Sequence, residues 1–291
     1  MTFLWSTSWV LIKIGLRAEL PPVTFAGLRY GLAALCLAPF VLLNRSHRLA
    51  LRNLSQRDWV RLTLLGVVLY TITQGAQYLS LAYLPAVVVN LLLNLTPIIV
   101  GMTAIFTLKE PPTPLQWAGV VLAAMGTGIY FLPLTFPSAA FVGLGAAIVG
   151  LLANSISTLQ GRQVNRDSSI PPLVVTFVSM GIGAALMLGI GLVSQGIGKP
   201  TLLDWGIIAW LAVVNTAFTF TLWNGTLRTL TAVESSILNS LMMPQIAILA
   251  VIFLDETLTA KEIIGLVLVF AGVIVVQLKR NKASQRDKSH A

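Results

Sequence analysis

The apolar residues of this chain are grouped into blocks of about twenty, the length that crosses a hydrocarbon core about 30 Å thick at about 1.5 Å per residue. Only 10% of the residues are charged and the mean hydropathy is +0.85, whereas a soluble domain carries about a quarter charged residues. Membrane barrels have spans of about ten residues with alternating polarity, and no such alternation occurs in this sequence. The pattern therefore predicts an all-α polytopic membrane protein.

Ten transmembrane helices are predicted from the apolar blocks and the charged or Pro/Gly-rich breaks between them. The expected spans are 3–18, 22–43, 62–83, 86–107, 114–132, 141–161, 172–194, 204–223, 232–253 and 260–278. The first span is short and lacks the basic region and small-residue cleavage site of a secretory signal. We therefore expect a retained helix, and a natural start upstream of Met1 stays open.

The basic residues predict the orientation, because cytoplasmic loops are enriched in Lys and Arg. With the N-terminus inside, fourteen of the nineteen Lys and Arg residues fall on the inner side and four on the outer side. Both termini are therefore predicted to be cytoplasmic. This bias also explains the net charge of +9, so we expect membrane lipid and no nucleic acid as a partner.

Internal repetition divides the chain into two similar parts. Pro97 precedes Pro244 by 147 residues, and the glycines Gly119 and Gly126 precede Gly265 and Gly272 by 146. Two copies of five helices are thus predicted, and because five is odd, the second copy must enter the membrane from the opposite side. The expected divisions are a first repeat over 1–137, a second over 138–279 and a basic cytoplasmic tail over 280–291.

Local motifs explain several of the repeated residues without a ligand. Thr113 with Gln116, Thr259 with Glu262, and the stretch from Thr231 to Glu234 are typical of capping boxes that open helices. The four repeated glycines, spaced seven residues apart within each copy, predict close packing between helices.

Longer motifs in the chain resemble a known family. They are an early Trp-Ser in "LWSTSWVLIK", an Arg in "GLRYGLAALCLAPF", and the paired stretches "TPIIVGMTAIFTLKEPPTPLQWAGVVLAAMGTGIYFL" and "MPQIAILAVIFLDETLTAKEIIGLVLVFAGVIVVQL". The paired stretches look like the two repeats of the EamA family in the drug/metabolite transporter superfamily. The resemblance implies a ten-helix carrier, typically an exporter in a bacterial inner membrane, with a central cavity lined by both repeats.

Polar residues inside the apolar spans identify candidate substrate contacts, because such groups usually face the bundle interior or a water-filled cavity. Asn90, Asn94 and Pro97 fall on one helix face, at positions i, i+4 and i+7. The predicted substrate-binding residues are Gln74, Gln77, Tyr78, Asn90, Asn94, Thr219, Trp223, Ser236 and Asn239. The alternative is that these side chains only tie helices together. Pro97 and Pro244 are predicted mid-helix hinges or gates, with static kinks as the alternative.

Charged residues are rare inside the spans, and no Asp or Glu lies in the middle of any of them. This argues against a proton antiporter that relies on a central carboxylate. Arg29 and Lys13 are the nearest membrane cations. We expect both to extend toward the outer surface, with contact to an anionic group as the alternative.

The sequence does not support an enzyme. His47 and His290 lie in a loop and in the tail, and Cys36 is the single cysteine, so neither a zinc cluster nor a Cys/His nucleophile pair can be assembled. The patterns of serine hydrolases, zinc proteases and P-loop proteins are absent. We expect no catalytic residues, no cofactor and no metal.

The pattern favours a secondary transporter that moves a small polar metabolite, an amino acid or related compound, across the cell (inner) membrane by alternating access, with export as the direction. A carrier for drugs or nucleotide-type metabolites stays open, as does a non-transporting scaffold or receptor, which would have a dry, filled centre. A channel is disfavoured, because inverted repeats suit a carrier that closes one side at a time. The oligomeric state is also open, with a homodimer among the arrangements.

Overall fold

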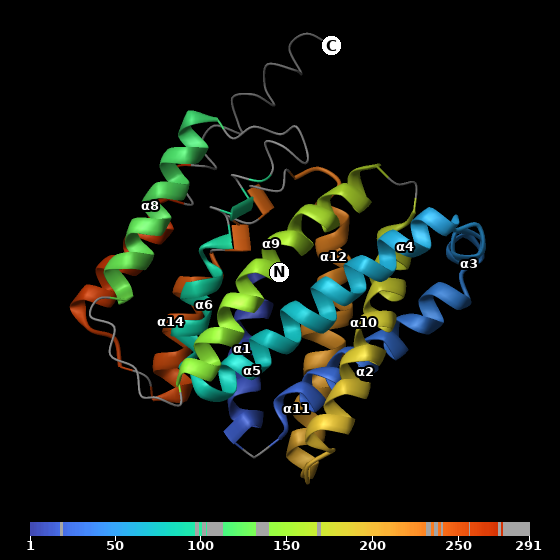
Figure 1. Ribbon diagram of the computed structural model, residues 1–291, viewed down its shortest axis with the longest axis horizontal. Helices are drawn as coiled ribbons and strands as arrows, with labels where there is room; N and C mark the ends of the chain where they lie inside the picture. The colour runs from blue at the N-terminus through green and yellow to red at the C-terminus, as the bar shows by residue number, and fades with distance from the viewer. Residues whose placement is uncertain are drawn as a thin grey trace.

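The structure is a computed structural model, and the regular elements of its described residues are helices (Figure 1). It describes residues 1–17, 20–96, 99–100, 103, 113–131, 140–167, 170–230, 234–235, 238–239, 241–255, 257–272 and 275, and no strand occurs among them. Four earlier predictions lie outside these residues: the hinge at Pro97, the substrate contact at Ser236, the cap at Thr231 and the basic tail over 280–291.

The first half of the chain forms helices close to the predicted spans. They are α1 (Thr2–Arg17), α2 (Pro22–Leu42), α3 (Arg45–Arg52), α4 (Gln56–Leu65), η1 (Gly66–Gln74), α5 (Gly75–Tyr83), α6 (Ala86–Leu93) and α8 (Pro114–Phe131). Proline at the first helical position suits the starts of α2 and α8, because its missing N–H would have no partner there. The α3 helix was not predicted, because it is short, carries Arg45, Arg48 and Arg52, and buries none of its residues.

The second half of the chain is also helical where the structure describes it. Its elements are α9 (Ala140–Asp167), α10 (Pro172–Gln195), α11 (Leu202–Ala212), η2 (Val213–Phe218), α12 (Thr219–Thr226), α14 (Met242–Leu254) and a helix over 260–272. Within the described parts of both halves, four stretches are long and apolar enough to cross a membrane, namely Pro22–Leu42, Ala140–Arg166, Pro172–Gln195 and Leu202–Thr226. Two predicted capping boxes are confirmed, since Thr113 N–H donates to Gln116 Oε1 at 2.8 Å and Thr259 N–H donates to Glu262 Oε2 at 2.5 Å.

Two segments of π-helix interrupt the α-helical ladder at related positions. The η1 segment begins at Gly66 and η2 begins at Val213, 147 residues later. In η1 the Thr73 hydroxyl donates to the Val68 carbonyl at 2.8 Å. Directly after η2, the hydroxyl of Thr219, the first residue of α12, donates to the Val214 carbonyl at 2.9 Å, again five residues earlier. A π-segment widens the helix and often marks a functional site. Neither segment was predicted.

The helices expected over 86–107 and 232–253 are both interrupted. The α6 helix ends at Leu93, and Asn94 and Leu95 form a turn. In the second half, Leu241 forms a turn directly before α14. The prediction that Pro244 lies at mid-helix is wrong, because Pro244 is the third residue of α14, where a backbone N–H has no partner within the helix.

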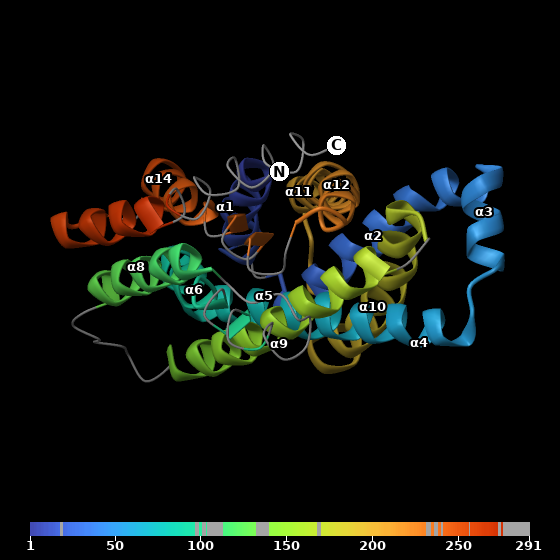
Figure 2. The ribbon, with the colours of Figure 1, turned by 90° about the horizontal axis from the view of Figure 1, so that it is seen from above.

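Glycines set the closest helix contacts, as predicted. At the crossing of α8 with the 260–272 helix, a Cβ added to Gly126 would lie 2.5 Å from the Gly265 carbonyl oxygen, and one added to Gly272 would lie 2.6 Å from that of Gly119. The α2 and α10 helices also pack closely, since a Cβ on Gly27 would lie 2.6 Å from the backbone of Leu188. Figure 2 shows α8 at one end of the molecule and α3 at the other, with α1, α5 and α12 between them.

Candidate functional site

A cavity lies among these middle helices. The empty space between its lining atoms is about 1030 Å³, counting the part that is open to solvent. Side chains from α1, α2, η1, α5, α6, α9 and α12 line it, together with Asn239 and Met242. Both halves of the chain therefore contribute to one space.

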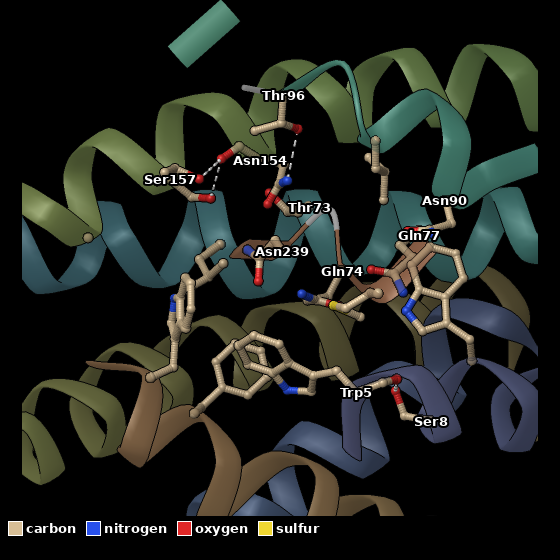
Figure 3. Close-up of a pocket in the computed structure, with 18 of the residues that line it drawn as sticks. Trp5, Ser8, Thr73, Gln74, Gln77, Asn90, Thr96, Asn154, Ser157 and Asn239 are labelled. Atoms are coloured by element: carbon tan, nitrogen blue, oxygen red, sulfur yellow. Dashed lines mark hydrogen bonds between the residues drawn. The ribbon is translucent and has the colours of Figure 1, made fainter. Parts of the chain in front are cut away.

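One wall of the cavity is polar. Thr73, Gln74 and Gln77 come from η1 and α5, and Asn154 and Ser157 come from α9. The Asn154 amide donates to Thr96 Oγ1 at 3.1 Å, and the Ser157 hydroxyl donates to the Asn154 carbonyl at 3.0 Å. In Figure 3, Thr96, Asn154 and Ser157 lie on one side of the space and Trp5 and Ser8 lie on the other.

The opposite wall is aromatic and is formed by α1 and α12. The Trp5 ring centroid lies 5.1 Å from that of Phe220 and 5.3 Å from that of Trp223. Trp9 also lines the space. Tilted and edge-to-face contacts of this kind hold aromatic side chains in place, so the wall offers a preformed apolar surface.

Four buried polar atoms in the lining have no hydrogen-bond partner among the described residues. Two are donors, Trp5 Nε1 and Asn90 Nδ2, and two are acceptors, Asn94 Oδ1 and Asn239 Oδ1. The orientation of Asn94 is defined, because its Nδ2 donates to the Asn90 carbonyl at 2.8 Å. Leaving a buried polar group unpaired costs about 1 to 3 kcal/mol, so these atoms are suited to bind a polar solute.

Arg29 does not extend toward the outer surface. Arg29 is 2% exposed and lines the cavity. Its Nε donates to Thr216 Oγ1 at 2.7 Å and its Nη1 to Tyr78 Oη at 3.1 Å. Lys13 donates to the carbonyls of Leu81 and Leu84 at 2.6 and 2.7 Å, where a cation complements the C-terminal end of α5. The prediction is wrong for Arg29, because two hydroxyl groups hold its guanidinium inside the bundle. For Lys13, which is half-buried at the end of α5, it stays a prediction.

The predicted substrate contacts fall into three groups. Six of them line the cavity: Gln74, Gln77, Asn90, Asn94, Trp223 and Asn239. Two do not: Tyr78 is fully buried against Arg29, and the Thr219 hydroxyl donates to the Val214 carbonyl. Ser236 is outside the described residues. Asn215 fits the alternative role of a tie between helices, because its amide donates to Leu4 O and to Thr7 Oγ1.

The contribution of α9 was missed. Asn154, Ser157, Thr158 and Gly161 all line the cavity, whereas none of the predicted substrate contacts lies in α9. The signal was present in the sequence, because "NSISTLQ" from Asn154 to Gln160 interrupts an otherwise apolar span and places polar residues at helical spacing on one face.

Comparison with known proteins finds similarity to a family of transporters. The model of the EamA-like transporter family matches residues 1–132 and 141–278. The chain is 25% identical over 294 residues to the uncharacterized transporter YvbV of Bacillus subtilis strain 168, covering 96% of this chain and 90% of that one. It is 24% identical over 230 residues to protein PecM of Dickeya dadantii strain 3937, covering 78% and 76%.

One solved crystal structure matches the fold with a TM-score of 0.74, over 95% of this chain and 94% of the other. The two sequences are 20% identical, so this likeness concerns the fold alone.

Proposed function

This chain belongs to the EamA-like transporter family, and on that premise we propose that it is a secondary carrier that exports a small polar metabolite, an amino acid or related compound. Members of the family are transporters and not enzymes, so the chain is a membrane transporter. The substrate class, the outward direction, alternating access and the cytoplasmic membrane are the parts that we propose.

The cavity with two unlike walls is the observation that carries this proposal. Unpaired amide atoms of Asn90, Asn94 and Asn239 suit a solute with both donors and acceptors, and the aromatic wall of Trp5 and Trp223 suits its apolar part. A non-transporting scaffold would be expected to fill its centre with apolar side chains. The open, polar space therefore favours a carrier over that alternative.

Two inverted five-helix repeats, with both termini cytoplasmic, are the architecture that we propose for this carrier. The π-segments begin 147 residues apart, at Gly66 and Val213, and the breaks at Asn94 and Leu241 are also 147 residues apart. Equivalent irregularities at equivalent distances support a duplicated unit. Because interrupted helices often line the sites of transporters, the two breaks are candidate hinges for alternating access.

A ligand screen followed by flux measurements tests this function. The thermal stability of the purified chain is measured in detergent with amino acids, nucleosides, sugars and small drugs, because a ligand that binds only the folded state raises it. The stabilising compounds are then assayed for transport into proteoliposomes by Asn94→Leu and Asn239→Leu. Each substitution removes one hydrogen bond of about 1 kcal/mol, so affinity should fall about fivefold.

The matched control is Asn53→Leu, because Asn53 is exposed at the end of α3 and outside the cavity. It should transport as the wild type does. Unchanged affinity in both cavity variants, with normal folding, would remove the site assignment. A stability screen without any hit would instead move weight toward the scaffold.

A further inference from the structure

Arg29 is the one lining residue with a formal charge among the described residues of the cavity. Its guanidinium group is buried, and no described Asp or Glu pairs with it. Of its five N–H donors, one is taken by Thr216 and one by Tyr78, and both partners are neutral hydroxyls. A buried cation without a counter-ion is costly, so the cavity has a place for an anion.

The guanidinium lies at one end of the aromatic wall. Its carbon is 5.1 Å from the ring centroid of Tyr30, and the Tyr30 centroid lies 6.0 Å from that of Phe220. The Phe220 centroid in turn lies 5.1 Å from that of Trp5. A continuous row of rings thus leads from the positive charge into the apolar part of the cavity.

We propose that Arg29 is the anion-binding residue of this cavity and that its ligands are monocarboxylates whose apolar part lies along the aromatic wall. This inference rests on the carrier function proposed above and narrows its substrate class. The planar guanidinium can donate two parallel hydrogen bonds to a carboxylate. One negative charge neutralises the one positive charge of the described lining, whereas a phosphate dianion would leave a net charge in a site of low dielectric constant.

A purely structural role for Arg29 makes a different prediction. Its bonds to Tyr78 in α5 and to Thr216 in η2 join segments from both halves of the chain. If Arg29 were only a tie, changing it would remove both bonds and removing either partner would remove one, and no ligand would distinguish the variants. Tyr78→Phe and Thr216→Val each remove one hydroxyl and leave the guanidinium in place, so they separate the two roles.

The test compares matched carboxylate and carboxamide probes on the purified full chain in detergent, with thermal stability as the measurement. The pairs are benzoate with benzamide, indoleacetate with indoleacetamide, and leucine with leucinamide. For at least one pair, the carboxylate should bind about tenfold or more tightly than the carboxamide, as expected for hydrogen bonds to a charged group. Arg29→Gln should abolish this preference, while Tyr78→Phe and Thr216→Val should keep it.

The other outcomes each overturn the inference in a distinct way. If both members bind equally in every pair that binds, a small-solute carrier stands without an anion site. Stabilisation by inorganic phosphate or by phosphatidylglycerol micelles in preference to every carboxylate would assign Arg29 to phosphate or to a lipid headgroup. If no probe and no compound of the earlier screen binds, the proposed function fails as well. Should Arg29→Gln not fold, Arg29→Lys takes its place, since it keeps the charge but loses the paired donors and should reduce the preference.

Discussion

The segments 66–78 and 213–224 occupy equivalent places in the two halves, but they differ in what they present to the cavity. Both contain a π-segment, and in both a threonine hydroxyl bonds to the carbonyl five residues back. At positions 146 residues apart, however, Gln74 and Gln77 of the first half are replaced by Phe220 and Trp223 of the second. All four side chains line the cavity.

A side-chain hydrogen bond that joins two helices also differs in chemistry between the two halves. In the first half, Arg29 of α2 donates to Tyr78 of α5 at 3.1 Å, and in the second, Asn224 of α12 donates to Thr176 of α10 at 2.8 Å. The two bonds join residues at corresponding positions in the sequence, but only the bond in the first half involves a charged side chain, Arg29. The backbone irregularity is thus common to both halves, whereas the side chains that face the cavity differ in their chemistry.

The largest effect is expected from exchanging the residues that begin the two π-segments. Gly66 is pressed against α10, where an added Cβ would meet the Ser179 carbonyl oxygen, whereas Val213 is 48% exposed. Gly66→Val should therefore destabilise the protein by about 3 kcal/mol or more, and Val213→Gly by about 0.5 to 1 kcal/mol. Unfolding midpoints in detergent measure both. Equal losses would show that the two segments are packed alike.

A smaller effect is expected when Trp223 of the aromatic wall is replaced by glutamine, the residue found at the corresponding position 77 of the polar wall. Trp223→Gln removes the ring whose centroid lies 5.3 Å from that of Trp5. Aromatic solutes should then bind about tenfold more weakly, given about 1.4 kcal/mol for a ring contact. Aliphatic solutes should lose less. Titration of thermal stability with both kinds of solute decides this, and a uniform loss would argue against two distinct walls.

The polar wall should respond more modestly. Gln77→Leu removes one side chain that can donate and accept hydrogen bonds, which is worth about 1 kcal/mol or about fivefold in affinity. Flux into proteoliposomes and ligand-dependent stability should both register the loss. Leu192, an exposed residue of α10 outside the cavity, offers the control Leu192→Gln. If Gln77→Leu bound its ligands as the wild type does, the polar wall would have no part in recognition.

The smallest effects should be equal in the two halves. Thr73→Val and Thr219→Val each remove one hydroxyl bond to a carbonyl of a π-segment, and such bonds in membrane proteins average about 0.6 kcal/mol. Each variant should therefore lower the unfolding midpoint slightly and by a similar amount. A large loss in one variant alone would show that the two π-segments are held by different means.

Much of the fold could be predicted because its signals are local. The span expected over 22–43 is the helix Pro22–Leu42, and the span expected over 172–194 is Pro172–Gln195, since paired prolines and charged breaks limit each apolar run. The π-segments and the break before Pro244 could not be predicted in this way, because each depends on a change of hydrogen-bond register that leaves composition and periodicity almost unaltered.

The candidate site was predicted in part for a related reason. Asn90 and Asn94, or Gln74 and Gln77, share a helix face by spacing alone, and all four line the cavity. Tyr78 has the same polar spacing but is turned to Arg29, and Asn154 of α9 was overlooked. Spacing identifies a face that avoids lipid, but it does not distinguish a face that meets a cavity from one that meets another helix.

The sequence by itself determined that this protein lies in a membrane and where most of its helices begin and end. It also determined the close packing at the glycines of α8 and the polar faces of the helices, because each follows from residues close together in the chain. Only the tertiary structure decided that Arg29 faces the cavity and that the polar and aromatic walls oppose each other. The Arg29 bond to Thr216 joins residues 187 positions apart. Contacts at that separation depend on how the helices pack, and local hydropathy does not identify which distant residue a side chain will contact.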